Sequence, residues 1–340
     1  MLPLLRVVAL CCVAALPARS FAQGFDLQAH RGGRGLMPEN TLPAFANAIS
    51  IGVTTLELDC GITADGVVVI LHDRRLNPDI TRGPDGNWLA ALGPPVHALT
   101  YTVLSRYDVG RLKPGTRYAA GQPEQKPVDG TRIPRLADLF ALVARAGNSE
   151  IRFNIETKIS PLEREETVDA ETFATAIVNE IRKAGMARRS TIQSFDWRTL
   201  KIAQAIAPEI PTVYLSAQQK WLDNIGADNR AGSAWTAGLN AREIGSVPKM
   251  VKQAGGAVWS PYFGDATPEL VHEAHALGLQ VVVWTVNSEI DMRSLLAREK
   301  DARVDGIISD RPDLLRRIAA EAGVALPMPF AVQPPAPDRQ

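Results

Sequence analysis

Cysteine is scarce in this chain. Its 340 residues include 3 cysteines, and two of them, Cys11 and Cys12, lie close to the N-terminus. The third, Cys60, has no partner left for a disulfide, so stability must come from a hydrophobic core rather than from cross-links. Cys60 lies beside two carboxylates on a predicted strand, and we expect a buried, inert thiol there rather than a nucleophile.

The chain also lacks net charge. Lys+Arg and Asp+Glu both number 37, and no long basic run is present. This balance argues against a basic surface that binds along the phosphates of a nucleic acid, so nucleic acid is not an expected partner. With 46% apolar residues the chain can bury a large core, and one catalytic domain is the default organisation. Composition leaves the oligomeric state open.

A short apolar run stands at the N-terminus. Arg6 precedes the run at 7–16, and the small residues Ser20 and Ala22 follow it. This order is typical of a secretory signal peptide, which we place at residues 1–22 with cleavage after Ala22. The alternative is an uncleaved membrane anchor, but the run is far shorter than the ~20 residues that a spanning helix needs. We therefore expect an exported protein, periplasmic or secreted, without stable membrane insertion.

After residue 22, short apolar strands alternate with amphipathic helices. This alternation indicates a parallel sheet. Eight strand–helix units in ~300 residues fit an α/β fold of the TIM (β/α)8 barrel type. One predicted strand is then left over, and it lies either in an insertion or at an irregular beginning of the barrel. A doubly wound sheet is the alternative. Strands are predicted at 25–29, 54–58, 67–71, 151–155, 191–193, 212–215, 257–260, 281–284 and 306–308, and helices at 41–51, 136–144, 170–184, 198–206, 268–277 and 312–320.

The barrel domain is predicted at 23–325, and two stretches of the chain depart from this rhythm. Residues 77–133 are rich in Gly, Pro, Asp and Arg and show little periodicity, which indicates an insertion between the second strand region and its helix. An insertion at that place lies on the catalytic rim, where it can cover the mouth of the site and select substrates. The Pro-rich tail at 326–340 is predicted to be disordered.

The first motif that carries chemistry is QAHRGGRGLMPENT. An apolar strand leads into His30 and Arg31, and residues just past a barrel strand face the active site. His30 titrates near neutral pH and can act as an acid or a base, while Arg31 presents donors suited to phosphate oxygens. By itself a His-Arg-Gly tripeptide is weak, and a lone histidine is more often structural.

The second motif is TTLELDCGITADGVVVILHD. Side chains alternate along a strand, so Glu57 and Asp59 share one face and form an anionic pair suited to Mg²⁺ or Ca²⁺. Solvated charges beside a strand are the alternative interpretation of that pair. However, the Asp65-Gly66 turn leads into another strand that ends at His72, which brings a second histidine to the same end.

The third motif is EIRFNIETK, in which Glu156 and Lys158 share one face of a strand. Glu156 supplies a third carboxylate, and Lys158 a positive charge for phosphate or for balancing the metal ligands. An ion pair between these two side chains is an equally good interpretation.

The C-terminal half contributes VVVWTVN, in which Trp284 ends a strand. Trp284 can form an apolar wall beside the glycerol or alcohol of a substrate, although a large aromatic residue more often belongs to the core. We interpret His97, His272 and His275 as surface or structural residues.

Taken together, the ordered motifs HRG, PENT, ELD, TADG, HD, IETK, WTVN and SD-x-PD resemble the glycerophosphodiester phosphodiesterase family. A single motif is weak, whereas the set in this order is specific and runs through nearly the whole chain after residue 22. The resemblance implies a TIM barrel, a divalent metal held by Glu57, Asp59 and Glu156, and general acid–base catalysis shared by His30 and His72.

The same resemblance implies that Arg31 and Lys158 bind the phosphate. Glu39, within PENT, is interpreted as a residue of the helix start or as a supporting residue near the site, with the helix start favoured. One departure concerns the rim: the family commonly has an arginine after the leucine that follows HD, whereas here Asn77 follows Leu76.

The implied activity is metal-dependent hydrolysis of small-molecule glycerophosphodiesters to glycerol 3-phosphate and an alcohol, with Ca²⁺ or Mg²⁺ as cofactor. One histidine would take a proton from the nucleophile, either water or a neighbouring glycerol hydroxyl, and the other would protonate the leaving alcohol. The sequence does not assign these two parts.

Two other functions are weighed against this one. A phospholipase D-like enzyme acting on lysophospholipids or sphingomyelin would need an apolar rim that meets a membrane, and no amphipathic basic segment stands out. A non-catalytic phosphodiester-binding protein on the same barrel is the second, but pure binding does not require a pair of proton-transfer histidines.

Overall fold

Eight parallel strands form a closed barrel in the computed structural model, which describes residues 24–227 and 229–333. The signal peptide predicted at 1–22 lies outside these residues. The strands follow one another around the barrel in chain order, with β1 beside both β2 and β11, so no barrel strand is left as an open edge. The predicted TIM barrel is confirmed, and the doubly wound sheet is wrong. The barrel strands are β1 Asp26–Ala29, β2 Thr55–Ile62, β4 Arg152–Thr157, β5 Ser190–Ser194, β6 Thr212–Ser216, β9 Val258–Pro261, β10 Gln280–Val283 and β11 Gly306–Ser309.

The extra strand is β3, Val68–Ile70, which was predicted at 67–71. It runs antiparallel to the end of β2, with Cys60 opposite Ile70, so it extends one barrel strand and does not enter the barrel. The tight Thr63-Ala64-Asp65-Gly66 turn produces this reversal, since Gly66 has a φ of 78° that L-residues rarely adopt. The third predicted strand is therefore not a barrel strand, and it leads from the end of β2 toward the insertion at 77–133.

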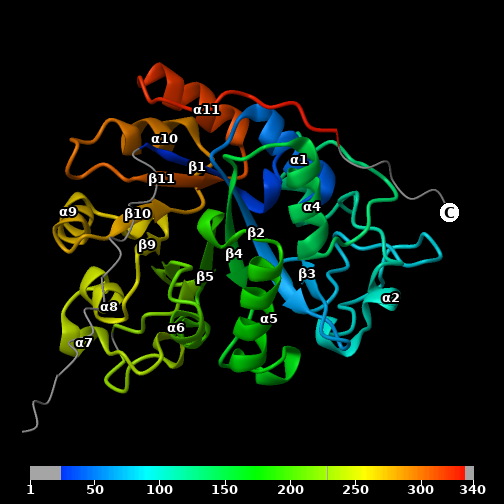
Figure 1. The fold of residues 1–340 in the computed structure, drawn as a ribbon, viewed down its shortest axis with the longest axis horizontal. Helices are drawn as coiled ribbons and strands as arrows, with labels where there is room; N and C mark the ends of the chain where they lie inside the picture. The colour runs from blue at the N-terminus through cyan, green and yellow to red at the C-terminus, as the bar shows by residue number, and fades with distance from the viewer. Residues whose placement is uncertain (1–23, 228, 334–340) are drawn as a thin grey trace, which may run out of the picture.

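Helices surround the strands on the outside of the barrel (Figure 1). The six predicted helices are present with ends shifted by a few residues, and α8 and α10 were missed because they are short. The outer helices are α1 Leu42–Ile51, α4 Leu136–Ala146, α5 Ala170–Lys183, α6 Trp197–Ile206, α8 Val247–Gln253, α9 Pro268–Ala276, α10 Glu289–Leu296 and α11 Pro312–Glu321. Shorter elements are the helices α2 Tyr101–Leu104, α3 Arg117–Ala120 and α7 Ala241–Ile244, the strand pair β7 Gln218–Gln219 and β8 Leu222–Asp223, and the 3-10 turns His30–Gly32, Val96–Ala98, Arg164–Glu166, Ala187–Arg189, Ala234–Thr236 and Phe263–Asp265.

Local sequence explains where these helices begin and end. In α1, the hydroxyl of Thr41 accepts a hydrogen bond from the backbone N–H of Ala44, which satisfies a donor that the first turn leaves free. Gly52 ends the helix with a φ of 89°, the left-handed conformation that glycine adopts without strain. A serine or threonine side chain caps the N-terminus of three further helices in the same way: Ser246 in α8, Thr267 in α9 and Ser288 in α10.

The main core lies between the helices and the outer face of the strands. Its largest fully buried side chains are Trp197, Trp259, Tyr214, Phe45, Phe153 and Phe173. A smaller cluster of Val213, Val258, Val282 and Ile308 fills one part of the barrel interior. Cys60 is completely buried in the main core, and burial raises the pKa of its thiol, as expected for an inert cysteine.

The segment 77–133 lies between β3 and α4 and contains α2 and α3. It packs on a second, smaller apolar cluster that includes Val69, Val96 and Leu104. A few ordered contacts with its own core are typical of a long loop that serves a function. The position agrees with the insertion predicted between the second strand region and its helix.

The first part of the predicted disordered tail is packed in the structure. The backbone N–H of Phe330 donates to the carbonyl of Ile49 at 3.3 Å, and that of Val332 donates to Ser50 Oγ at 3.4 Å. The segment thus runs back along α1 (Figure 1), while residues 334–340 lie outside the described range. Among the residues described, no helix combines the length and apolar character needed to cross a membrane.

Candidate active site

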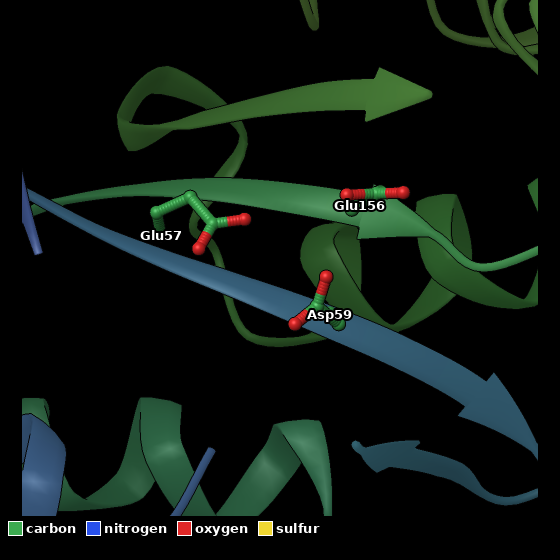
Figure 2. A group of neighbouring side chains, drawn as sticks. All are labelled: Glu57, Asp59 and Glu156. Carbon is green, nitrogen blue, oxygen red and sulfur yellow. The ribbon is translucent and has the colours of Figure 1, made fainter. Parts of the chain in front are cut away.

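Three carboxylates meet at the carboxyl ends of two neighbouring barrel strands. Glu57 and Asp59 come from the same face of β2, and Glu156 comes from β4 directly opposite Asp59 in the strand register. Figure 2 shows the three side chains on one side of the two strands. Oxygen atoms from all three lie within 4.8 Å of one another, and the residues are 2%, 1% and 6% exposed. Strand alternation predicted the pairing of Glu57 with Asp59, and the family resemblance implied that Glu156 joins them.

The charges of these carboxylates are not equivalent. Burial, together with Asp59 and Glu156, raises the pKa of Glu57 well above its usual value. Burial also raises the pKa of Glu156 to about 7, although Lys158 partly opposes the shift. Burial acts in the same direction on Asp59, but His72 and Lys158 outweigh it and hold the pKa of this carboxyl well below its usual range. Asp59 is therefore the carboxylate most firmly ionised.

This donor set fits a hard divalent cation. Three buried carboxylates in one place repel one another, and a cation among them removes that cost. Oδ1 of Asp59 is buried with no hydrogen-bond partner, which is expensive for an ionised oxygen unless a ligand completes it. Oxygen ligands of this kind suit Mg²⁺ or Ca²⁺ rather than a soft metal.

Further side chains orient the carboxylates. Asn40 donates from Nδ2 to Oδ2 of Asp59 at 2.9 Å, and Gln193 on β5 donates from Nε2 to Oε1 of Glu57 at 2.6 Å. The amide of Asn154 supports Gln193 in turn, at 2.9 Å. Asn40 and Gln193 were not among the predicted site residues, although Gln193 lies at the end of a predicted strand, which is the signal that could have found it.

His30 begins the turn after β1 and pairs with Asp310, which follows β11. Its Nδ1 lies 2.5 Å from Oδ1 of Asp310, so Nε2 is the nitrogen left for proton transfer. Burial lowers the pKa of His30 from 6.5, and Asp310 partly offsets this shift. Burial opposes ionisation of Asp310, but His30 outweighs it and holds the pKa of this carboxyl low. Asp310 is a site residue that the sequence analysis did not assign.

His72 follows β3 and has a carboxylate partner of its own. Its Nδ1 lies 2.7 Å from Oδ1 of Asp73, and Asn77 donates to the other oxygen of Asp73 at 2.7 Å. Burial, followed by Arg31 and Lys158, lowers the pKa of His72 from 6.5 to about 4. His72 is therefore neutral at neutral pH and able to accept a proton.

The turn around Arg31 is unusually tight. Arg31 has a φ of 52°, and a side chain at the following Gly32 would come within 2.9 Å of Ala44, so only glycine fits there. The backbone N–H of Arg31 donates to Oε2 of Glu57 at 2.8 Å. The HRG sequence thus places the arginine directly beside the carboxylates.

The Arg31 guanidinium forms a hydrogen bond through Nη1 but none through Nε. Its Nη1 donates to Oε1 of Glu39 at 2.8 Å, while its Nε lies 3.4 Å from Oδ2 of Asp59. This Nε is buried and has no hydrogen-bond partner, so it remains a donor for an anion. The favoured interpretation of Glu39 as a helix-start residue was wrong, because Thr41 is the N-cap of α1 and the Glu39 side chain binds Arg31.

Lys158 lies just past β4 and faces the same carboxylates. Its Nζ donates to Oε1 of Glu156 at 2.8 Å and lies 3.7 Å from Oδ1 of Asp59. The ion pair considered from the sequence is present. It also places a positive charge beside the group of carboxylates.

Trp284, directly after β10, belongs to an aromatic cluster at the same rim. Its ring centre lies 5.2 Å from that of Phe195, 5.9 Å from Tyr262 and 6.1 Å from Trp221. Trp221 is 61% exposed. Lys158 Nζ lies 5.9 Å from the ring centre of Phe195, so the cluster adjoins the charged site. The predicted strand ended one residue too late, since Trp284 lies outside β10.

Two of the remaining histidines lie on the outside of the barrel, and the third, His97, lines a small cavity that Asp73 and Lys158 also line. His272 and His275 lie on the outer helix α9, where they pair with Asp301 and Asp305. His97 lies in a 3-10 turn of the segment 77–133.

The fold and this grouping of residues define a (β/α)8 hydrolase, with its site at the carboxyl ends of the strands. A family model described as "Glycerophosphoryl diester phosphodiesterase family" matches residues 30–314. The chain therefore belongs to this family and is a phosphoric diester hydrolase.

Individual relatives agree with this assignment. The chain is 31% identical over 301 residues to a Mycobacterium tuberculosis protein named "Probable glycerophosphodiester phosphodiesterase 2", a match that covers 87% of this chain and 90% of the relative. The crystal structure of a Silicibacter pomeroyi protein named "Putative glycerophosphoryl diester phosphodiesterase" is 36% identical, with a TM-score of 0.78 and coverage of 89% of this chain and 95% of that protein. An Oleispira antarctica phosphodiesterase solved with sn-glycerol-3-phosphate is 22% identical, with a TM-score of 0.61 and coverage of 87% and 97%, and shows the shared fold.

Proposed function

We propose that this chain hydrolyses glycerophosphodiesters to glycerol 3-phosphate and an alcohol, using a divalent cation and the two histidines. The observation that carries the proposal is the buried group of Glu57, Asp59 and Glu156, in which an ionised oxygen of Asp59 accepts no hydrogen bond from the described residues. Family membership supports the substrate class, and the Oleispira antarctica relative holds the corresponding product.

Glu57, Asp59 and Glu156 would hold the cation, either Ca²⁺ or Mg²⁺. Such an ion, when bound, offsets negative charge on the phosphate oxygens and makes phosphorus easier to attack. The raised pKa values of Glu57 and Glu156 mean that protons must leave these groups before they can act as ligands.

Arg31 and Lys158 bind the non-bridging oxygens of the phosphodiester. The buried Nε of Arg31 supplies a donor for the phosphate, because it makes no hydrogen bond to any described residue and lies only within ion-pair distance of Asp59. Both cations are already oriented by Glu39, Glu156 and the backbone turn, so their charges are in place before the phosphate arrives.

His30 and His72 divide the proton transfers. One takes the proton of the nucleophile, which is water or the neighbouring glycerol hydroxyl, and the other donates a proton to the leaving alcohol oxygen. Their partners Asp310 and Asp73 engage Nδ1 in each ring, which fixes the ring orientation and leaves Nε2 for the substrate.

The aromatic cluster at Trp284 would contact the apolar part of the substrate. Its position beside Lys158 places an apolar wall next to the charged site, where the glycerol or the alcohol group of the diester would lie. The N-terminal segment 1–22 supports export, so the enzyme would meet its substrates in the periplasm or outside the cell. N-terminal sequencing of the processed chain tests this, with Gln23 expected as the first residue.

The test of the function is product analysis on a substrate panel. The purified enzyme is incubated with glycerophosphocholine, glycerophosphoethanolamine and lysophosphatidylcholine in the presence of Ca²⁺ or Mg²⁺. Glycerol 3-phosphate released from the first two supports the proposal. Cleavage of lysophosphatidylcholine alone would favour the phospholipase D-like alternative, and binding without cleavage would favour a phosphodiester-binding protein.

A further inference from the structure

A tyrosine from the segment 77–133 reaches the phosphate end of the site. Tyr118 lies on α3, and its hydroxyl is 2.5 Å from Oε2 of Glu39. The same oxygen lies 3.2 Å from Nη1 of Arg31 and 3.2 Å from Nη1 of Arg34. The hydroxyl therefore donates its proton to the carboxylate and accepts hydrogen bonds from both arginines.

The chain after Tyr118 is fastened to the loops that carry the site. Gln125 donates from Nε2 to the carbonyl of Arg34 at 2.8 Å, and the N–H of Lys126 donates to the carbonyl of Leu36 at 2.8 Å. Gln122 donates to Oδ2 of Asp310 at 3.2 Å. The segment that follows Tyr118 is thus held to Arg34 and Leu36, just past the turn that carries Arg31, and to Asp310.

The hydroxyl has a specific effect on Arg31. Glu39 has two carboxylate oxygens, and Arg31 uses one of them while the Tyr118 proton occupies the other. This arrangement fixes the carboxylate, so that Nη1 of Arg31 stays on the Glu39 side. Asp59, an ionised carboxylate 3.4 Å from Arg31 Nε, is the competing partner toward which the guanidinium would otherwise shift.

We propose that Tyr118 is a positioning residue that holds Arg31 for phosphate recognition, so that the segment 77–133 completes the phosphate site. The inference rests on the proposed function. It adds Tyr118 to the phosphate site, and the sequence pattern did not identify this residue because it lies 87 positions from Arg31. Tyr118 acts through Arg31 and Glu39 rather than by contact with the reacting atoms.

The hydroxyl can be removed without removing the ring. The Arg34 guanidinium carbon lies 5.7 Å from the centre of the Tyr118 ring, and phenylalanine preserves that contact. Tyr118→Phe therefore deletes only the bridging oxygen. Tyr107→Phe is the matched control, because Tyr107 belongs to the same segment but packs against its small apolar cluster.

The experiment compares the two variants with wild type in three measurements: KM and kcat for glycerophosphocholine, the Kd for glycerol 3-phosphate by calorimetry, and the Tm. For Tyr118→Phe we expect KM and Kd to rise about tenfold, because Arg31 loses the hydroxyl that holds its guanidinium beside Glu39. The Tm and the pH profile of kcat should stay close to wild type, and Tyr107→Phe should match wild type throughout. Unchanged KM and Kd in Tyr118→Phe would overturn the proposal, and so would a lowered Tm and kcat with unchanged KM and Kd.

A double mutant tests whether the effect passes through Arg31. In an Arg31→Lys background, Tyr118→Phe should change Kd by less than about twofold, because lysine cannot keep the geometry that the hydroxyl supports. A full tenfold effect in that background would contradict a role through Arg31.

If the wild type cleaves no glycerophosphodiester, the proposed function fails by itself. Calorimetry with inorganic phosphate and glycerol 3-phosphate then still decides the inference, since weaker binding by Tyr118→Phe supports it and equal or absent binding overturns it.

Discussion

Nδ1 of His30 lies 2.5 Å from Oδ1 of Asp310, a residue 280 positions further along the chain. The contact exists because β1 and β11 are neighbours in the closed barrel, so the residues that follow them share one rim. Asp310 is itself fixed by Asn287, which donates to its Oδ2 at 2.8 Å and accepts from its backbone N–H at 2.9 Å. Barrel closure therefore brings a histidine from the first strand together with a carboxylate from the last.

Replacing Asp310 with asparagine should slow the enzyme and change its pH profile. Asp310 raises the pKa of His30 against the lowering effect of burial, so its loss should lower that pKa further. The limb of the pH–rate profile that His30 controls then moves to lower pH, whether His30 serves as acid or base. The rate should fall about 10- to 100-fold. Asp301→Asn, which alters an exposed Asp–His pair on the barrel exterior, is the control and should leave the profile in place.

Removing either of the two histidines proposed to transfer protons should abolish most turnover. His30→Ala and His72→Ala are each expected to lose roughly 10²- to 10⁴-fold in kcat, because each deletes one proton-transfer group. The circular dichroism spectrum and Tm should be retained, which separates chemistry from folding. His272→Ala serves as the control, since this side chain is 64% exposed on α9. Full activity in His72→Ala would contradict the assigned role.

The cation should stabilise the fold, and more strongly at higher pH. Glu57 and Glu156 have raised pKa values, with Glu156 at about 7, so protons compete with the cation below that pH. As the pH rises through 7, Glu156 ionises, repulsion among the carboxylates destabilises the metal-free protein, and the cation binds more tightly. The shift in Tm caused by Ca²⁺ or Mg²⁺ should therefore be larger at pH 8 than at pH 6.

Asp59→Asn is the variant that tests the location of this cation. It should remove the metal-induced shift in Tm, whereas Glu171→Gln, on the exposed surface of α5, should keep it. An equal shift in Asp59→Asn and wild type would place the cation elsewhere.

Gln193 should be required for tight cation binding although it is not a ligand. It is 1% exposed and donates to Glu57 at 2.6 Å. Leucine at this position removes the donor that orients the carboxylate, so the Kd for the cation should rise about 10- to 100-fold by calorimetry. It also removes one of the two acceptors of the Asn154 amide, the other being Oε1 of Gln28, at a cost of about 1–3 kcal/mol in the free energy of unfolding. Gln253→Leu on the exposed face of α8 should change neither quantity, and wild-type affinity in Gln193→Leu would refute the assignment.

The sequence predicted the parts of the site that depend on local patterns. Alternation along a strand placed Glu57 and Asp59 on one face, and the position of Glu156 at the end of a neighbouring strand brought it to the same rim. The alternation of strands and helices likewise predicted a parallel sheet, although it left a doubly wound sheet as the alternative to the barrel. These features need only short-range periodicity and the rule that parallel strands end on one side.

The rest depended on contacts between distant segments. Tyr118 lies in a stretch with little periodicity, and only the folded path of the segment 77–133 brings it to Arg31. The helix α10 has eight residues, and Ile290 near its start is 80% exposed, so its apolar periodicity is weak even though Ser288 caps it. The helix-start interpretation of Glu39 failed because Thr41, two residues later, caps α1 more directly.

The most direct test of the central claim is release of glycerol 3-phosphate from glycerophosphocholine by the purified chain after removal of residues 1–22. It is measured with Ca²⁺, with Mg²⁺ and with a chelator, for wild type and for His72→Ala. We predict release by the wild type with at least one of the two cations, loss of release with the chelator, and little release by His72→Ala. Release that persists in the chelator, or no release with either cation, would contradict the account.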